Sequence, residues 1–316
     1  MVETLANRVL SLAQDDESFR RRPQPWVVDM VGDCVEEWIE APNQNNLRRL
    51  VGDEFTLVTA RLDAARSLDS EELHRGIEEV YDAVLGAVGD RQLIRVWNFI
   101  PGILEPLTEF RHRYMVFNAG RFHAYSRWYK GRDNFDRRLA TASGVGVDDD
   151  DFTVHALATG NVNVPVENPR QVSSYCYSEK YGSLPPCFAR ATRVEFKKNA
   201  SARLLVGGTA SICGETTAHR DDLHSQVEET LRNLASVVAS GVGGENFDVN
   251  RGRLRQAMLA RFRHLRVYCP HQEDLEIVMA QLPQEFENAE RLEFIRSDLC
   301  RDGLLVEIEG WADVGT

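Results

Sequence analysis

Two parts of the chain predict a similar order of secondary structure, and this repetition constrains the fold more than any other feature. In the first part, residues 55–61 and 93–97 read as strands on either side of a helix over residues 69–88. In the second part, strands are predicted at 193–196, 204–206, 265–268, 292–295 and 304–308, and helices at 222–239 and 273–282. Such alternation predicts an α/β (α+β) fold of two halves, each a mixed sheet with helices packed on one face.

A proline-rich stretch separates the two halves. Its prolines are Pro165, Pro169, Pro185 and Pro186. We therefore expect an N-terminal half over residues 51–160, a connecting segment over residues 161–187 and a C-terminal half over residues 188–316. Near the start of the chain, Leu5, Val9 and Leu12 follow at helical spacing, which predicts a helical extension over residues 1–50.

The charge and composition of the chain limit its partners and its location. A formal net charge of -12 leaves no basic field for nucleic acid, although a local group of arginines could still bind a small anion. No apolar run approaches the roughly 20 residues that span a bilayer, and the basic run Arg20–Arg22 follows the first apolar stretch, the reverse of a secretory signal. The six cysteines show no zinc spacing. We expect a cytoplasmic protein with reduced cysteines, no membrane contact and no bound metal.

The best candidate for a catalytic acid lies in the last predicted strand. Side chains alternate across a strand, so Glu307 and Glu309 share one face while Val306 and Ile308 share the other. If the aliphatic face packs into the core, the glutamates line the opposite face. A carboxylate enclosed there loses solvation, so its pKa rises and it can act as a general acid near neutral pH. The alternative is that Glu307 is an ordinary exposed strand residue.

Several short motifs follow one another along the chain. They are residues 97–103 (WNFIPGI), 117–121 (FNAGR), 167–172 (ENPRQV), 188–192 (FARAT), 204–211 (LLVGGTAS), 226–234 (QVEETLRNL) and 306–309 (VEIE). In this order they resemble the chorismatases, chorismate-cleaving enzymes whose C-terminal half is similar to the YjgF/RidA fold. The resemblance extends over about residues 55–312. It implies two YjgF/RidA-like halves, of which the first is degenerate and the second is catalytic.

The resemblance implies a cofactor-independent enzyme whose small-molecule substrate is chorismate. Protonation of the vinyl methylene of the enolpyruvyl ether would start the reaction, and the resemblance assigns this proton to Glu307, with Glu309 as the nearest alternative. Capture of the resulting cation by a ring hydroxyl gives a hydroxybenzoate, above all 3-hydroxybenzoate and also 4-hydroxybenzoate. Capture by water gives a dihydroxycyclohexadiene carboxylate, and either route releases pyruvate. An imine deaminase of the RidA type and a non-catalytic carboxylate-binding module stay open as alternatives.

A substrate with two carboxylates requires cations, preferably arginines that form paired hydrogen bonds. Arg190, within the FARAT motif, is the first candidate for this role. Arg121, Arg170 and Arg296 are further candidates, although each taken singly fits a surface or interface residue as well.

Other side chains are expected to shape the substrate pocket. Tyr175 and Tyr181, in the connecting segment, could donate hydroxyl hydrogen bonds or simply pack. In the resemblance, Cys213 and Gly214 lie near the ring of the substrate, where Cys213 would limit the access of water. Cys300, seven residues before Glu307, is expected to shape the pocket or to relay a proton. Because YjgF-like domains form trimers, we expect either a monomer or a homotrimer.

Overall fold

The computed structural model describes residues 2–5, 8–13, 21–41, 44–198, 201–243, 248 and 252–315. The chain divides into two compact units. Unit 1 comprises Met1–Arg20, Val162–Ser173 and Arg190–Thr316, and unit 2 comprises Arg21–Asn161 and Ser174–Ala189. Among the described residues, no helix combines the length and the apolar character that crossing a bilayer would need.

Unit 1 is built on an eight-stranded mixed sheet. Its strands lie in the order β1 (Val2–Leu5), β2 (Arg8–Ala13), β17 (Arg291–Arg296), β16 (Phe262–Cys269), β18 (Glu307–Asp313), β13 (Ala202–Ala210), β12 (Ala191–Glu195) and β11 (Asn163–Val166). Strand β17 pairs in parallel with β2 and β16, whereas the other neighbours are antiparallel. A small hairpin of β14 (Ile212–Cys213) and β15 (Thr216–Thr217) follows β13.

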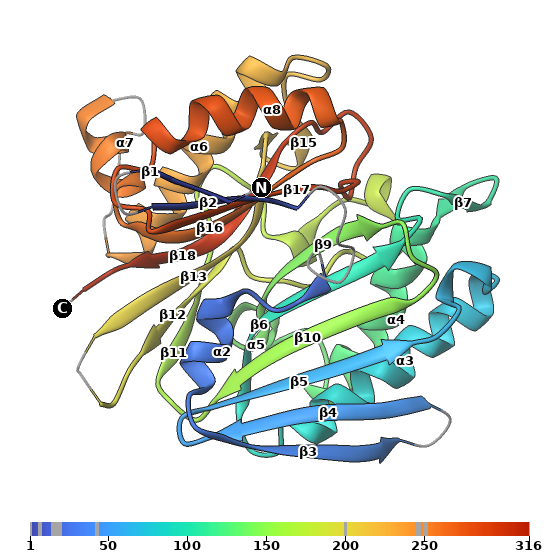
Figure 1. Ribbon diagram of the computed structural model, residues 1–316. Helices are drawn as coiled ribbons and strands as arrows, with labels where there is room; N and C mark the ends of the chain where they lie inside the picture. The colour runs from blue at the N-terminus through green and yellow to red at the C-terminus, as the bar shows by residue number, and fades with distance from the viewer. Residues whose placement is uncertain are drawn as a thin grey trace. The chain divides into compact units, whose positions relative to one another are not determined.

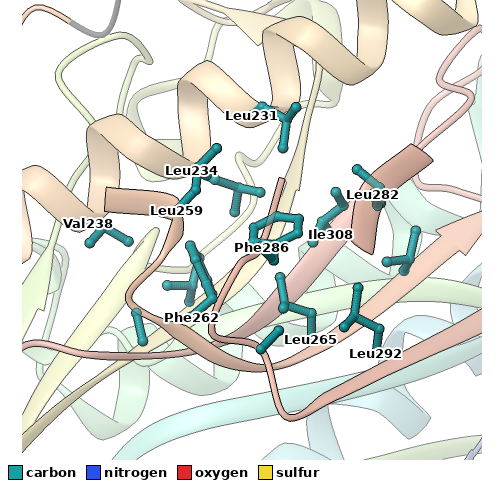
Figure 2. Close-up of a cluster of buried hydrophobic side chains, with 14 of the residues drawn as sticks. Leu231, Leu234, Val238, Leu259, Phe262, Leu265, Leu282, Phe286, Leu292 and Ile308 are labelled. Carbon is teal, nitrogen blue, oxygen red and sulfur yellow. The ribbon is translucent and has the colours of Figure 1, made fainter. Parts of the chain in front are cut away.

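Three helices cover one face of this sheet: α6 (Leu223–Gly241), α7 (Gly252–Leu259) and α8 (Gln272–Gln281), as Figure 1 shows. Helix α6 begins where the Asp222 carboxylate accepts the backbone N–H of Ser225 at 3.1 Å, which caps the helix. The apolar side chains of these helices pack on the apolar side chains of the strands and form the core of unit 1 (Figure 2). Its labelled residues are Leu231, Leu234, Val238, Leu259, Phe262, Leu265, Leu282, Phe286, Leu292 and Ile308. The core of unit 1 therefore takes one face of every central strand, and the alternate side chains point to the other face.

Unit 2 is built on a six-stranded mixed sheet. Its strands lie in the order β3 (Cys34–Ala41), β4 (Gln44–Gly52), β5 (Phe55–Leu62), β10 (Phe152–Thr159), β6 (Gln92–Pro101) and β9 (Thr141–Val147), and only β6 and β9 pair in parallel among these described strands. The shorter elements are η1 (Ala65–Ser67), β7 (Pro106–Thr108), β8 (Arg111–His112), α5 (Phe135–Arg138), η2 (Ser174–Cys176) and η3 (Glu179–Tyr181).

Helices lie on both faces of the unit 2 sheet. Helices α3 (Ser70–Ala87) and α4 (Arg113–Trp128) cover one face and the short helix α2 (Pro25–Val31) the other, as Figure 1 shows. The neighbours Trp97 and Asn98 of β6 mark the two faces. Tyr81 of α3 donates its hydroxyl to Asn98 Oδ1 at 2.5 Å, whereas Trp26 of α2 packs edge-on against Trp97 at a ring distance of 5.9 Å.

The predicted α/β class is confirmed, because both sheets are mixed and carry helices. The predicted helices over residues 69–88 and 222–239 are α3 and α6. The helical extension over residues 1–50 is wrong, because the described part of this region forms β1 to β4 together with the short α2. In Arg8–Ala13, pairing with β17 overrides the helical spacing of the apolar residues. The predicted strand over residues 304–308 begins at Glu307, and the stretch 161–187 holds β11, η2 and η3. All six cysteines are free in the structure.

Candidate active site

Glu307 is the first residue of β18 and lies on the face of the unit 1 sheet that the helices do not cover. Its neighbours Val306 and Ile308 belong to the core, so alternation sends the Glu307 side chain to the other face, where it is 4% exposed. The prediction that the glutamates occupy the face opposite the aliphatic residues is confirmed. In the sheet, Glu307 stands between Ala210 of β13 and Tyr268 of β16.

A β-bulge brings backbone against the Glu307 carboxylate. The pairing of β13 with β18 shifts register between Val206 and Thr209, so the bulge contains Gly207 and Gly208. A Cβ atom placed on Gly208 would lie 1.9 Å from Glu307 Oε1 and 2.7 Å from its Cδ. Glycine at position 208 therefore allows the carboxylate to lie directly on the backbone of the bulge.

Glu309 lies on the same face but belongs to a buried network of polar side chains. It is fully buried, and Tyr268 donates its hydroxyl to Glu309 Oε1 at 3.0 Å. Burial and the nearby Glu309 carboxylate raise the pKa of Tyr268 well above its usual value, which keeps the phenol protonated as a donor. In the register of the sheet, Glu309 stands opposite Arg266, whose guanidinium pairs with Glu293 at 2.7 Å. This network holds the Glu309 side chain in place.

Arg190 lies beside the same bulge. Its carbonyl accepts the N–H of Gly207 at 2.9 Å, which continues the pairing of β12 with β13 by one residue. Ala191 belongs to the core, so the Arg190 side chain points to the face of Glu307. In the register of the sheet, Arg190 lies opposite Gly207 on one side of β13, and Glu307 lies opposite Ala210 on the other side. The buried Arg190 guanidinium donates to the carbonyl of Val172 at 2.9 Å.

Glu167 is a carboxylate of this region that the sequence did not single out as a candidate. Glu167 follows β11. The charge of Arg190 and hydrogen bonds from Ser173 and from the Arg190 backbone each lower its pKa. Burial nevertheless dominates and raises the pKa of Glu167 above its ordinary value. Its Oε2 atom is buried without a hydrogen-bond partner among the described residues. The only sequence signal for Glu167 is its place in the ENPRQV motif, and that place does not predict its burial.

The hairpin that carries Cys213 and Gly214 is attached to the segment that holds Arg190. The N–H of Gly214 donates to the carbonyl of Arg170 at 3.0 Å, and the N–H of Val172 donates to the carbonyl of Gly214 at 2.9 Å. Gly214 has a φ of +59°, a left-handed conformation that favours glycine. Cys213 is exposed at the tip of this hairpin. Unit 1 therefore links Glu307, Arg190 and the Cys213 hairpin through one set of backbone contacts.

Two other candidate arginines have different surroundings. Arg170 pairs with the Glu229 carboxylate and donates to Asn233 Oδ1 at 2.9 Å, so it ties the ENPRQV segment to α6. Arg296 ends β17 at a position that shares the helix-covered face of Phe294, and it contacts Asp298 at 3.5 Å and the Pro270 carbonyl at 3.2 Å. The structure does not group either side chain with Glu307. Cys300 is half-buried in the turn between β17 and β18.

Arg121 lies in unit 2, on the face of α4 that packs against α3. It is 2% exposed, stacks on Phe117 at 4.9 Å and donates to Asn118 Oδ1 at 2.9 Å. Among the described residues, no carboxylate lies within ion-pair distance of Arg121, and its Nε–H has no acceptor. Burial alone would lower the pKa of Arg121, but the nearby Tyr81, Tyr114, Tyr125 and Cys187 raise it above the usual value. A buried guanidinium without a counter-ion is costly to the folded state.

The tyrosines of the connecting segment also lie in unit 2. Tyr175 is half-buried, its ring meets Phe135 edge-on at 6.4 Å, and its carbonyl accepts from Arg132 at 3.0 Å. Tyr181 packs on Tyr177 at a ring distance of 5.4 Å.

Burial raises the pKa of the Cys187 thiol to about 12, although the charges of Arg121 and Arg132 oppose this shift. Arg132 is thus a further cation of this region that sequence analysis did not name.

A buried carboxylate on the face of a mixed sheet that the helices leave uncovered, with a buried arginine beside the same bulge, is an arrangement typical of enzymes that act on small anionic substrates. Comparison with known proteins makes this assignment specific. The family model described as "Chorismatase FkbO/Hyg5-like, N-terminal" matches residues 34–158. The chain belongs to the chorismatase family.

The family relationship extends over most of the chain. A chorismatase of Streptomyces rapamycinicus is 32% identical over 74% of this chain and 69% of the relative. A 3-hydroxybenzoate synthase of Streptomyces hygroscopicus is 32% identical over 72% of this chain and 65% of the relative. A crystal structure of a chorismatase superposes with a TM-score of 0.71 at 27% identity and covers 87% of this chain and 80% of the other. The predicted family and the predicted class, a chorismate-cleaving enzyme, are confirmed.

Proposed function

We propose that this protein cleaves the enolpyruvyl ether of chorismate to pyruvate and 3-hydroxybenzoate, with Glu307 as the general acid. The observation that carries the proposal is the position of the Glu307 carboxylate, which is 4% exposed and lies on the Gly208 bulge. The proposal is further supported by relatives that bear the names chorismatase and 3-hydroxybenzoate synthase.

The reaction begins with transfer of the Glu307 proton to the vinyl methylene of chorismate. This step turns the ether carbon into an oxocarbenium ion, and a positioned acid contributes about a hundred- to ten-thousand-fold in rate. A ring hydroxyl then adds to the cation, the original ether bond breaks, and collapse of the adduct releases pyruvate while the ring becomes aromatic and returns a proton. No water is consumed on this route, and the atoms of chorismate are divided between the two products. Enclosure of the acid limits competing attack by solvent.

The two carboxylates of chorismate require cationic partners. Arg121 stays a candidate from the resemblance, and its buried guanidinium has no carboxylate partner among the described residues. Arg190 supports the role more directly, because it lies on the Glu307 face of the unit 1 sheet. Glu167 beside Arg190 would keep that guanidinium oriented, and Cys213 on its hairpin would limit the access of water to the ring.

The test is incubation of the purified chain with chorismate, with pyruvate measured by a coupled dehydrogenase and the ring product identified by chromatography. We expect pyruvate and 3-hydroxybenzoate in equal amounts. Glu307→Gln should lower turnover at least a hundredfold while the circular dichroism and the unfolding midpoint stay unchanged. Glu276→Gln, an exposed carboxylate on α8, is the matched control and should keep full activity.

Each other outcome points to a defined alternative. Full activity in Glu307→Gln together with loss in Glu309→Gln would move the acid role to Glu309. Equal amounts of pyruvate and a dihydroxycyclohexadiene carboxylate would assign the hydrolytic route. Absence of pyruvate would overturn the proposal, and ammonia release from an imine substrate would then favour a deaminase. Size-exclusion chromatography with light scattering would separate a monomer from a homotrimer.

A further inference from the structure

Two histidines and a glutamate converge between helices α3 and α4 of unit 2. His74 and Glu78 lie one turn apart on α3, and His123 lies on the facing side of α4. One nitrogen or oxygen atom of each side chain lies within 4.8 Å of the corresponding atoms of the other two. These three side chains are called the helix cluster. The mechanism proposed for chorismate cleavage uses none of them.

A close approach of the two helices creates the cluster. A Cβ atom on Gly120 of α4 would lie 2.6 Å from the backbone oxygen of His74. Glycine at this position therefore lets the backbone of α4 lie against α3 at the level of His74. His123 is three residues further along α4, so it shares the helix face of Gly120 and points back to His74.

The distances within the helix cluster match the ligand spacing of a single metal ion. Nε2 of His74 lies 2.9 Å from Nδ1 of His123 and 3.6 Å from Oε2 of Glu78. Nitrogens bound tetrahedrally to one Zn²⁺ at its usual bond length lie about 3.3 Å from each other. Small side-chain movements would therefore place all three atoms around one ion. Two imidazole nitrogens and one carboxylate oxygen are ligands that Zn²⁺ and related ions accept.

Arg127 orients the carboxylate of the helix cluster. Its guanidinium binds Oε1 of Glu78, which directs Oε2 toward His74. Hydrogen bonds commonly orient ligating carboxylates in this way.

Room for further ligands lies next to His74. A cavity of about 450 Å³ is lined by His74 together with Arg75, Met115 and Lys180. A metal ion bound by three protein atoms retains an open position, which a water molecule can fill. The cavity gives that water access to His74.

We propose that His74, Glu78 and His123 form a binding site for a divalent transition-metal ion of the Zn²⁺ type, which crosslinks α3 and α4 of unit 2. Three ligands come from the chain and water completes the coordination. The site is independent of the proposed function, because none of its residues belongs to the chorismate chemistry.

The test is titration of the metal-stripped full chain with Co²⁺, followed by its visible d–d absorption, and with Zn²⁺, followed by calorimetry. We expect one equivalent of each ion to bind and Zn²⁺ to raise the unfolding midpoint. His123→Ala should weaken binding at least tenfold and abolish the thermal shift. His123 is exposed, so this change should leave the fold intact. Glu78→Gln should weaken binding in the same direction.

A matched control separates this site from other metal ligands of the chain. His224→Ala removes an exposed histidine outside the helix cluster and should leave the affinity unchanged. Charge-transfer bands of Co²⁺ with thiolate would assign the ion to an exposed cysteine and overturn the proposal. Absence of binding, or equal affinity of the wild type and of folded His123→Ala, would show that the helix cluster is a hydrogen-bonded histidine pair and no metal site.

Discussion

Substitution of Gly208 by alanine should disable the proposed acid without unfolding the protein. Gly208 has no positive φ, so alanine fits the backbone there. Its Cβ would lie 1.9 Å from Glu307 Oε1, whereas ordinary contact begins at 3.4 Å, so the carboxylate must move by about 1.5 Å. The atoms it meets are the end of a flexible side chain, which can rotate away. Displacement of a catalytic group by about 1 Å can cost on the order of a hundredfold in rate.

The assay is the steady-state release of pyruvate from chorismate, with kcat and KM determined separately. We expect kcat of Gly208→Ala to fall on the order of a hundredfold, with a smaller change in KM, because the acid rather than the substrate site is displaced. Gly86→Ala is the matched control, because a Cβ there meets nothing within 4 Å, and it should keep full activity. Full activity of Gly208→Ala would refute the assignment of Glu307 as the acid in this geometry. A lowered unfolding midpoint would refute the expectation that alanine fits the backbone at this position.

Two further predictions concern buried charges. Burial raises the pKa of Glu167, so the folded state binds a proton more tightly than the unfolded state. The free energy of unfolding of the wild type should therefore fall as the pH rises from the pKa of the unfolded state, near 4.3, through the raised pKa of the folded state. In urea unfolding at pH 4 to 7, Glu167→Gln should remove this dependence of the unfolding free energy on pH. An unchanged pH dependence would contradict the raised pKa of Glu167. Arg121→Met should lower kcat/KM for chorismate about a hundredfold, the loss expected for an uncompensated ligand charge. Its unfolding midpoint without substrate should stay near that of the wild type, because no carboxylate of the described residues pairs with Arg121; a large fall in the midpoint would instead indicate a structural role.

Local patterns explain why parts of the fold could be predicted. Helix α3 shows helical spacing of apolar residues and a capping box of Asp69 and Glu72, and both features depend on neighbours in sequence. The same spacing failed for Leu5, Val9 and Leu12, where a short segment can pair with an existing sheet edge and gains more from this than from a helix. Strands β3 and β4 carried too little alternation to be recognised among charged residues.

The candidate site divides in a similar way. Alternation along β18 correctly placed Glu307 and Glu309 opposite the core, because the period of a strand is local. The sequence could not rank the two acids, since the partner of Glu309 is Tyr268, which lies 41 residues earlier in the chain. Nor could the sequence distinguish Arg121 from Arg170. Arg170 pairs with Glu229, whereas Arg121 has no carboxylate partner among the described residues.

The sequence by itself determined the α/β class, the main helices, the family and the face of the sheet that carries the acids, because each follows from periodicity or from short contiguous motifs. Tertiary structure alone decided the bulge that seats the Glu307 carboxylate, the burial of Arg121 without a described carboxylate partner and the meeting of His74 with His123. These features arise where strands and helices from distant parts of the chain come into register. The environment of a charge, and hence its chemistry, depends on such contacts and not on its neighbours in sequence.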